Sequence, residues 1–426
     1  MQETQQEKRE RAVLVGLSAD SMAPEERSTE VTLEELSALL ETAGGEAVGF
    51  SLQNRDTPDP GSFIGSGKAL EIKDFLAAND CELAVFDNEL SPSQMRNLTE
   101  TLGVKVLDRS GLILDIFAGR AQTREGRLQV ELAQYQYLLP RLTGMWTHLV
   151  RQTASGGKSP IGTRGPGETQ LETDRRHIRR KIQKLQEELE EVRRVRGTQR
   201  RRRQKNEMPS VALVGYTNAG KSTLLNALTG AGIHTGDRLF DTLDTTTRRL
   251  RLDDTMEVLL SDTVGFIRKL PTQLVAAFKA TLEELDYADL ILHVIDVSNE
   301  DWAEQARVTE GLIRELGVET TPRIEVYNKC DLCEASLLPR NGEAVCISAA
   351  SGEGLDALRE RMFRLLTAGE KRVTFLLPYP KAGELERLHD ACRVLETEYT
   401  EEGIRVKVVC PPEIFGRLRE YLTDDE

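Results

Sequence analysis

Short apolar runs alternate with amphipathic segments along the first part of the chain. The apolar runs, which are typical of buried strands, cover residues 12–18, 47–52, 83–87 and 104–108. The segments with helical spacing of apolar residues cover 31–43, 66–79 and 91–102. Strands that alternate with helices predict a small α/β domain with a mainly parallel sheet.

Two longer segments carry apolar residues at alternating spacings of four and three instead. One stripe consists of Leu128, Leu132, Tyr135, Leu139 and Leu142, and the other of Ile178, Ile182, Leu185, Leu189 and Val192. Each stripe occupies one face of a helix, and two such stripes can pack against each other. A glycine-rich stretch lies between them at residues 155–168. We therefore predict an antiparallel helical hairpin with this stretch at or near its tip.

The second half of the chain returns to alternating strands and helices. Strands are expected at 211–215, 257–262, 289–296, 323–328 and 344–348, and in the tail at 373–379 and 404–410. The pattern predicts four domains. They are an N-terminal α/β domain (1–120), the hairpin (121–206), a second α/β domain (207–370) and a small C-terminal α/β domain (371–426).

Length and charge limit the possible partners. A chain of 426 residues is too long for one hydrophobic core. The formal charge of −14 argues against a general coat of nucleic acid, yet residues 141–205 hold 18 Lys or Arg against 7 Asp or Glu. Eight of these basic residues fall within 193–205, where no acidic residue occurs. A localised contact with a polyanion is one interpretation, and a solvated helix end or basic linker is the other.

The strongest motif follows the strand at 211–215 and opens a helical segment. Its residues, Gly215, Tyr216, Thr217, Asn218, Ala219, Gly220, Lys221 and Ser222, match G-x-x-x-x-G-K-S in full. Backbone N–H groups of such a loop point at phosphate oxygens, and the helix N-terminus adds partial positive charge. We expect Lys221 to reach the β- and γ-phosphates and Ser222 to offer its hydroxyl to Mg²⁺.

Two further segments complete the expected phosphate and metal site. The strand at 257–262 ends in Asp262, Thr263, Val264 and Gly265, a D-x-x-G element that we call the DTVG motif. Its carboxylate would hold Mg²⁺, and the Gly265 N–H would contact the γ-phosphate. One threonine of residues 240–247, the threonine loop, would complete the metal site and tie the loop to the γ-phosphate. The other expected nucleotide-site residues of this loop are Phe240, Asp241, Leu243 and Asp244. Thr242 is the expected ligand, and Thr245 to Thr247 are the alternatives.

A third pair of motifs predicts which base is bound. Asn328, Lys329, Cys330 and Asp331 match N-K-x-D after a strand. The two oxygens of Asp331 can accept hydrogen bonds from N1–H and the exocyclic amine of guanine, whereas adenine would leave them unpaired. Ser348, Ala349 and Ala350 follow the next strand, and their backbone N–H groups can contact the guanine O6. These motifs in this order predict a P-loop GTPase domain.

Two other glycine-lysine sequences fail the same test. Gly157-Lys158-Ser159 has Gln152 where the leading glycine belongs, and Pro160 follows it directly. Gly65 to Ala69 has its earlier glycine at the wrong distance and no hydroxyl after the lysine. The first is therefore not a nucleotide-binding loop, and we interpret the second as a glycine turn that opens a helix.

At this point the chain resembles the HflX family of translational GTPases over nearly its whole length. The matching motifs are FIGSGK (63–68), GPGETQLETDRR (165–176), GYTNAGKSTLLNAL (215–228), DTLDTTTRR (241–249), DTVGFIRKLP (262–271) and NKCD (328–331). The resemblance implies a cytoplasmic GTPase that binds the ribosome, mainly its large subunit. It also implies that subunits are split or held apart under stress. In that family the loop between the long helices approaches the peptidyl-transferase region of ribosomal RNA.

That role agrees with the charge of the hairpin. Lys158 and Arg164 lie in the glycine-rich stretch, where they could contact RNA phosphates or remain solvated. The basic run, in which Arg200, Arg201, Arg202 and Arg203 are consecutive, would add affinity through counterion release. Few aromatic residues are available for stacking on bases. We therefore expect RNA contact without base-specific recognition.

Two positions bear on the rate of hydrolysis. Phe266 follows the DTVG motif, where many GTPases carry a glutamine that orients the attacking water. Asn218 lies where some related GTPases use asparagine to help hold a monovalent cation. We therefore expect slow intrinsic hydrolysis that the ribosome stimulates, with a K⁺ dependence.

The overall prediction is a monomeric, ribosome-binding GTP hydrolase with Mg²⁺ as cofactor and no membrane span. The alternative is an RNA-binding ribosome assembly factor in which GTP is structural. Relatives credited with ATP use leave open a second nucleotide, with weak ATPase activity, in the N-terminal domain. The broken motif at Gly65 to Ala69 weakens that possibility.

Overall fold

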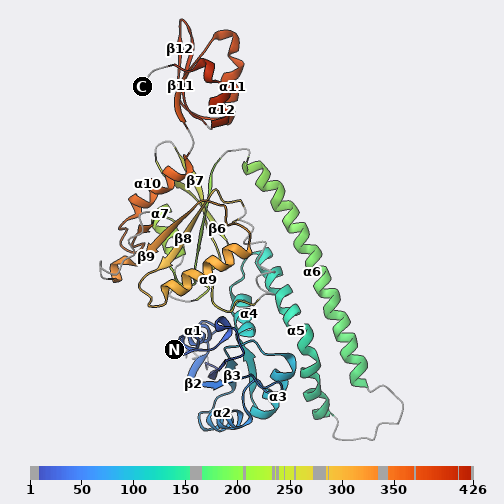
Figure 1. Ribbon diagram of the computed structural model, residues 1–426. Coiled ribbons are helices and arrows are strands. Elements are labelled where there is room, and N and C mark those ends of the chain that lie inside the picture. Colours follow the sequence, from blue (N-terminus) through green and yellow to red (C-terminus); the bar gives the residue numbers. More distant parts are fainter. Residues whose placement is uncertain are drawn as a thin grey trace, which may run out of the picture.

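The computed structural model describes most of the 426-residue chain. The described residues are 9–153, 166–204, 208–232, 236, 239–243, 245–253, 256–271, 285, 287–333, 344–368, 371–410 and 412–423. Within them the chain forms three sheets and a pair of long helices (Figure 1).

The first sheet belongs to the N-terminal unit, which runs from β1 to α4. Its strands are β1 (Arg11–Ala19), β2 (Glu46–Arg55), β3 (Leu83–Phe86) and β4 (Lys105–Asp108), in the order β2-β1-β3-β4 and all parallel. Its helices are α1 (Glu30–Thr42), α2 (Ser66–Ala78), α3 (Pro92–Leu102) and α4 (Arg109–Arg120). The predicted strands and helices are confirmed. Helix α4, which the apolar pattern did not predict, is an addition.

Local sequence signals explain where these helices begin and end. Thr29 and Thr32 form a reciprocal capping box at the start of α1, as Ser91 and Gln94 do at α3. Gly103 ends α3 with φ of 76°, a left-handed conformation that favours glycine. Helices α1 and α3 therefore begin at residues that satisfy free backbone N–H groups, and α3 ends at a glycine.

The long helices α5 (Arg124–Thr153) and α6 (Pro166–Gln204) lie side by side (Figure 1). The two predicted stripes meet in a cluster in which Leu128, Leu132, Leu185 and Leu189 are buried. Glu131 pairs with Lys181 across the helices at 3.1 Å, and Arg124 lies 3.9 Å from Glu188. Since the earlier residue of α5 pairs with the later residue of α6, the helices are antiparallel, as predicted.

The second sheet forms the core of the unit that the motifs predict to be a GTPase, called the GTPase unit below, which runs from β5 to α10. Its strands are β5 (Ser210–Gly215), β6 (Thr246–Arg251), β7 (Glu257–Asp262), β8 (Leu290–Asp296), β9 (Arg323–Asn328) and β10 (Val345–Cys346), in the order β10-β9-β8-β5-β7-β6. The described helices are α7 (Lys221–Thr229), α9 (Trp302–Glu315) and α10 (Leu355–Leu366). The five predicted strands are confirmed. The antiparallel edge strand β6 is an addition, and it occupies part of the predicted threonine loop.

The third sheet belongs to the C-terminal unit, which runs from β11 to α12. It consists of β11 (Lys371–Leu377), β12 (Arg393–Thr400) and β13 (Gly403–Cys410), with α11 (Gly383–Ala391) and α12 (Pro412–Arg417). The order is β11-β13-β12, and both pairings are antiparallel. The two predicted strands are confirmed as β11 and β13, and β12, which the apolar pattern did not predict, is an addition.

Candidate nucleotide-binding site

The P-loop connects β5 to α7 and can form only with glycine at its two motif positions. A Cβ on Gly215 would lie 2.2 Å from the carbonyl oxygen of Val294, and one on Gly220 would lie 2.3 Å from Nδ2 of Asn328. Gly220 also has φ of 90°, in the left-handed region. The motif therefore reflects close backbone packing as well as phosphate geometry.

Lys221 lies buried beneath the P-loop. Its Nζ donates to the carbonyl oxygens of Gly215 at 3.1 Å and Tyr216 at 2.8 Å. Burial lowers the pKa of Lys221 to about 8, and the nearby charge of Asp262 opposes this shift. An anion bound in the loop would favour the charged form.

Three oxygen groups predicted as metal ligands come together at the start of α7. The Ser222 hydroxyl donates to Oδ2 of Asp262 at 2.6 Å and shares a hydrogen bond of 2.8 Å with the hydroxyl of Thr242. The other carboxylate oxygen of Asp262, Oδ1, is buried and has no hydrogen-bond partner among the described residues. Burial raises the pKa of Asp262, against the effect of Lys221 and Ser222. Hard oxygen donors with one unsatisfied carboxylate oxygen fit Mg²⁺.

The DTVG motif lies directly against the P-loop. Thr217 N donates to the Phe266 carbonyl at 2.7 Å, and Phe266 N donates to the Gly215 carbonyl at 3.1 Å. A Cβ on Gly265 would lie 2.9 Å from Cγ2 of Thr217 and 3.1 Å from Nζ of Lys221. The Phe266 side chain is buried beneath the sheet in a separate apolar cluster. A movement of this backbone would therefore be transmitted to the P-loop.

These segments enclose a pocket. Its lining residues are Thr217, Asn218, Gly220, Lys221, Ser222, Thr223, Gly236, Phe240, Asp241, Thr242, Thr263 and Gly265. Thr223 and Gly236 were not predicted from the sequence. Thr223 follows the motif directly. Gly236 lines the pocket because its N–H donates to Oδ2 of Asp241 at 2.8 Å. A contact of that kind leaves no sequence pattern.

Asn328 links the base-binding motifs to the P-loop. Its Nδ2 donates to the Ala219 carbonyl at 2.9 Å, and its Oδ1 accepts from Ala349 N at 3.0 Å. Lys329 has φ of 62°, and its Nζ lies 2.6 Å from Oδ2 of Asp296. Asp331 is exposed in the turn that follows. The structure therefore brings the 328–331 and 348–350 segments together beside the phosphate loop.

Some predicted residues do not face the pocket. The side chains of Tyr216, Leu243 and Val264 are buried in an apolar cluster shared with the N-terminal unit. Ser348 and Ala349 are buried, and only their backbone could reach a base. Arg200, Arg201, Arg202 and Arg203 fall near the end of α6, but their side chains lie outside the described residues. So do Lys158, Arg164 and Asp244.

Comparison with known proteins agrees with this geometry. Three family models match: "GTP-binding GTPase N-terminal" over residues 30–118, "GTP-binding GTPase Middle Region" over 120–203, and "50S ribosome-binding GTPase" over 210–329. GTPase HflX of Caldanaerobacter subterraneus subsp. tengcongensis is 50% identical over 415 residues, which cover 97% of this chain and 94% of that protein. The chain belongs to the HflX family of GTPases. The resemblance inferred from the motifs is thereby confirmed.

Two further proteins are similar to this chain over most of its length. GTPase HflX of Escherichia coli K12 is 44% identical over 376 residues, which cover 87% of each chain. A crystallised GTP-binding protein of Sulfolobus solfataricus in complex with GDP is 26% identical, with a TM-score of 0.42, over 84% of this chain and 99% of that one. Within the described part of this HflX chain, no helix combines the length and apolar content of a membrane span.

Proposed function

We propose that this HflX GTPase is a ribosome-binding switch that splits ribosomal subunits or keeps them apart, notably under stress. One observation carries the proposal. Ser222 of the P-loop lies within hydrogen-bonding distance of both Thr242 of the threonine loop and Asp262 of the DTVG motif. The side chains that would hold the metal beside the γ-phosphate therefore also connect the P-loop, the threonine loop and the DTVG motif. Loss of the γ-phosphate would weaken the contacts among these three segments.

The residues of the chain have separate roles in hydrolysis. Lys221 neutralises charge on the β- and γ-phosphates, and the Gly265 N–H contacts the γ-phosphate as it leaves. Ser222, Thr242 and Asp262 would hold Mg²⁺, which would neutralise charge on the phosphates when bound. Asp331 would recognise guanine, with the backbone at Ser348 to Ala350 beside it.

Intrinsic turnover is expected to be slow. Phe266 is buried and has no polar group that could orient a water molecule. Asn218 has φ of 61° within the P-loop and lines the pocket. We expect ribosomes to stimulate hydrolysis and K⁺ to support it better than Na⁺. Equal turnover in both salts would contradict the cation role.

The helical hairpin is the proposed ribosome-contacting element. Helices α5 and α6 run side by side along the flank of the GTPase and N-terminal units (Figure 1). Their connecting residues include Lys158 and Arg164, and the opposite end of α6 carries the basic run. Positive charge at these places would bind ribosomal RNA by phosphate contacts. The description of the matching family model, a 50S ribosome-binding GTPase, supports the same partner.

Sedimentation of ribosomes with this protein tests the proposal. We expect association with large subunits, and conversion of intact ribosomes to subunits, with a non-hydrolysable GTP analogue but much less with GDP. Similar affinity in both nucleotide states would contradict the switch. Binding without any ribosome stimulation of hydrolysis would favour the alternative, an assembly factor with structural GTP.

A charge-matched pair of variants tests the basic run. Replacement of Arg200, Arg201, Arg202 and Arg203 by Gln should weaken subunit binding and reduce its salt dependence. The control replaces four exposed arginines elsewhere, namely Arg307, Arg314, Arg364 and Arg387. Equal losses in the two variants would show only a general effect of net charge.

A further inference from the structure

The turn that carries Asp331 begins with a residue in an uncommon backbone conformation. Lys329 has φ of 62°, in the left-handed region that residues other than glycine rarely adopt. A short 3-10 helix, Cys330–Leu332, follows directly, and Asp331 is exposed within it. Because Asp331 lies two residues after Lys329, a change in the φ angle of Lys329 would redirect the Asp331 carboxylate. The direction of that carboxylate therefore depends on what holds Lys329.

Asp296, at the end of the neighbouring strand β8, holds the side chain of Lys329. Oδ2 of Asp296 lies 2.6 Å from Nζ of Lys329. Oδ1 of Asp296 accepts from the backbone N–H of Ser298 at 3.0 Å and from the Ser298 hydroxyl. The Asp296 side chain is 13% exposed and that of Lys329 is 28% exposed. Both carboxylate oxygens are therefore engaged, and water screens this partly buried pair less than it screens a pair on the open surface.

Backbone hydrogen bonds place the turn beside the end of β8. Asp296 lies opposite Asn328 in the parallel pairing of β8 with β9, and the Val297 N–H donates to the Asn328 carbonyl at 3.2 Å. Further along the turn, the Cys330 N–H donates to the Ile347 carbonyl at 3.1 Å. These bonds fix the backbone on either side of the left-handed residue, and the ion pair adds a side-chain contact to that residue itself.

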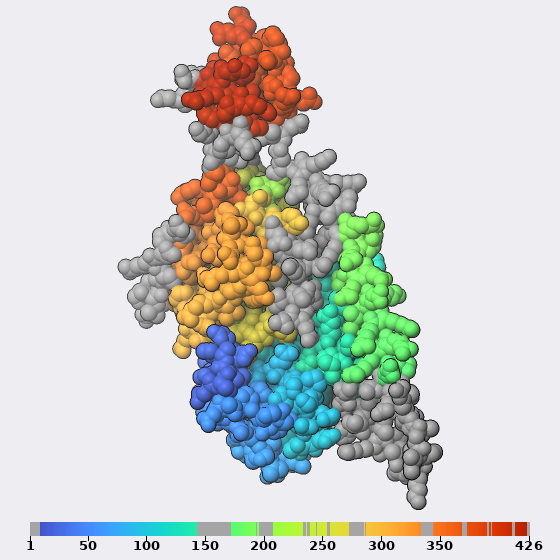
Figure 2. Space-filling model, turned by 45° about the vertical axis from the view of Figure 1, so that its right-hand side comes forward, coloured from blue at the N-terminus to red at the C-terminus, as the bar shows by residue number. Residues whose placement is uncertain are grey.

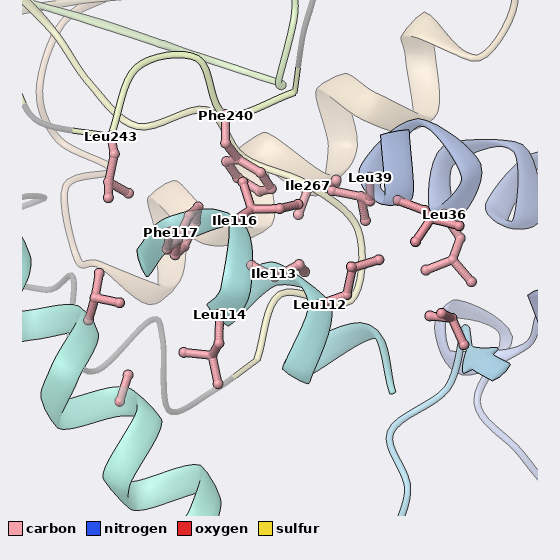
Figure 3. Close-up of a cluster of buried hydrophobic side chains, with 14 of the residues drawn as sticks. Leu36, Leu39, Leu112, Ile113, Leu114, Ile116, Phe117, Phe240, Leu243 and Ile267 are labelled. Carbon is pink, nitrogen blue, oxygen red and sulfur yellow. The ribbon is translucent and has the colours of Figure 1, made fainter. Parts of the chain in front are cut away.

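The ion pair is separate from the contact between the N-terminal unit and the GTPase unit. In that contact, the Asp87 carboxylate pairs with Arg109 at 2.7 Å and also with Lys269 of the GTPase unit. An apolar cluster joins the same two units (Figure 3). Asp296 and Lys329 belong to neither cluster, so their substitution leaves this contact in place.

We propose that Asp296 is a positioning residue for the recognition of guanine. Its charge holds the ammonium group of Lys329, which keeps Lys329 in the left-handed conformation and the Asp331 carboxylate directed at the base. Asp296 acts through Lys329 and contacts neither base nor phosphate in this role. The inference rests on the proposed recognition of guanine by Asp331, and it adds a residue outside the N-K-x-D motif to the selection of the base.

Binding of GDP and IDP to the nucleotide-free protein, without ribosomes, tests this role. The hypoxanthine base of IDP has N1–H but lacks the exocyclic amine of guanine, so the ratio of the two affinities reports how well the Asp331 carboxylate is placed. Asp296→Asn keeps the shape of the side chain and an acceptor for Ser298 but removes the charge. We expect affinity for GDP to fall about tenfold and affinity for IDP only about twofold, so that the preference for GDP narrows about fivefold.

The matched control removes the same charge from another ion pair of the GTPase unit. Asp356→Asn breaks the pair with Arg359 on α10 and should leave both affinities within about twofold of those of the unsubstituted protein. Equal losses of GDP and IDP affinity in Asp296→Asn would indicate only a general loss of structure and would overturn the proposal. An unchanged preference for GDP would overturn it as well.

A double-mutant cycle tests whether Asp296 acts through Lys329. Lys329→Met removes the ammonium group and keeps an unbranched side chain. In the Lys329→Met protein, the further change Asp296→Asn should alter affinity for GDP by less than about twofold, because the ion pair is already absent. A further loss of about tenfold would show that Asp296 acts by another route, contrary to the proposal.

Asp331→Ala separates this inference from the assignment of the base. It should abolish the preference for GDP over IDP, because both acceptor oxygens are lost. If Asp331→Ala abolishes the preference and Asp296→Asn leaves it intact, the role of Asp296 is wrong while the assignment of Asp331 stands. If Asp331→Ala keeps the preference, the assignment of Asp331 fails, and the role of Asp296 fails with it.

Discussion

Asp331 is the residue whose chemistry bears most directly on base recognition. It is exposed, and it is positioned by the turn after Asn328 and Lys329. In Asp331→Asn, one acceptor oxygen is replaced by an amide NH₂ donor. This donor cannot pair with the exocyclic amine of guanine, but it can donate to the carbonyl that xanthine carries in its place. We expect affinity for GTP to fall by about 100-fold or more and affinity for xanthosine triphosphate to rise. Calorimetric titration with both nucleotides measures this, and a variant that still prefers GTP would contradict the assignment.

His293 is a second residue with a measurable consequence. It lies buried on β8, and neither ring nitrogen has a hydrogen-bond partner in the described structure. Burial lowers its pKa to about 4 from 6.5. As the pH falls, His293 becomes protonated in the unfolded chain before it does so in the folded protein. The free energy of unfolding therefore falls as the pH drops from 6.5 towards 4.

At pH 5 this effect should amount to about 2 kcal/mol. We expect the His293→Leu variant to lose less stability than the unsubstituted protein between pH 7 and pH 5. Thermal denaturation of both proteins at the two pH values measures the difference. An equal loss of stability in the two proteins would mean that titratable groups other than His293 determine the pH dependence.

Residues in local motifs could be predicted from the sequence, and residues joined by long-range contacts could not. Gly215 to Ser222 are adjacent, so their spacing alone reveals the loop. Glu35 and Tyr216, by contrast, are separated by 181 positions, and Glu35 looks like an ordinary surface charge on an amphipathic helix. Arg109, which is 1% exposed, gave no sequence signal that it would be buried.

At the scale of elements, the hairpin depends on a short apolar interface. Leu185 is 2% exposed between α5 and α6. We expect Leu185→Ala to destabilise helix pairing by about 2–5 kcal/mol, with faster hydrogen exchange in α5 and weaker ribosome binding. Basal GTP hydrolysis should not change. Gln186→Ala, at an exposed position of the same helix, is the control. Unaltered exchange in α5 would show that the leucine interface does not hold the helices together.

Three elements were not predicted from the sequence, and each omission has a physical reason. Helix α4 is buried over most of its length, so RSGLILDIFAGR shows no polar face from which a helical period could be recognised. Strand β12, with the sequence RVLETEYT, is an edge strand whose charged residues resemble a loop. Strand β6 lies at the other sheet's edge, where TTRRLR is short and polar.

At the scale of the whole molecule, the C-terminal unit stands apart. Its buried residues form a cluster of their own, and Figures 1 and 2 show it at one pole of the molecule. We expect a chain that ends at residue 368 to hydrolyse GTP at a rate within about twofold of the full-length rate, because no residue of the nucleotide pocket is lost. A steady-state GTPase assay compares the two. A large loss of kcat would show that the unit supports the nucleotide site.

The shared carboxylate of Asp87 has a consequence for how the protein melts. Separation of the first sheet from the second would break the ion pair of Asp87 with Lys269 and divide one apolar cluster in two. The charges of Asp87, Lys269 and Arg109 would then be incompletely paired while still poorly hydrated. Unfolding of either the N-terminal unit or the GTPase unit alone would therefore carry a high free-energy cost. A scanning calorimeter should record these two sheets as a single cooperative heat-absorption peak, with the third sheet giving its own.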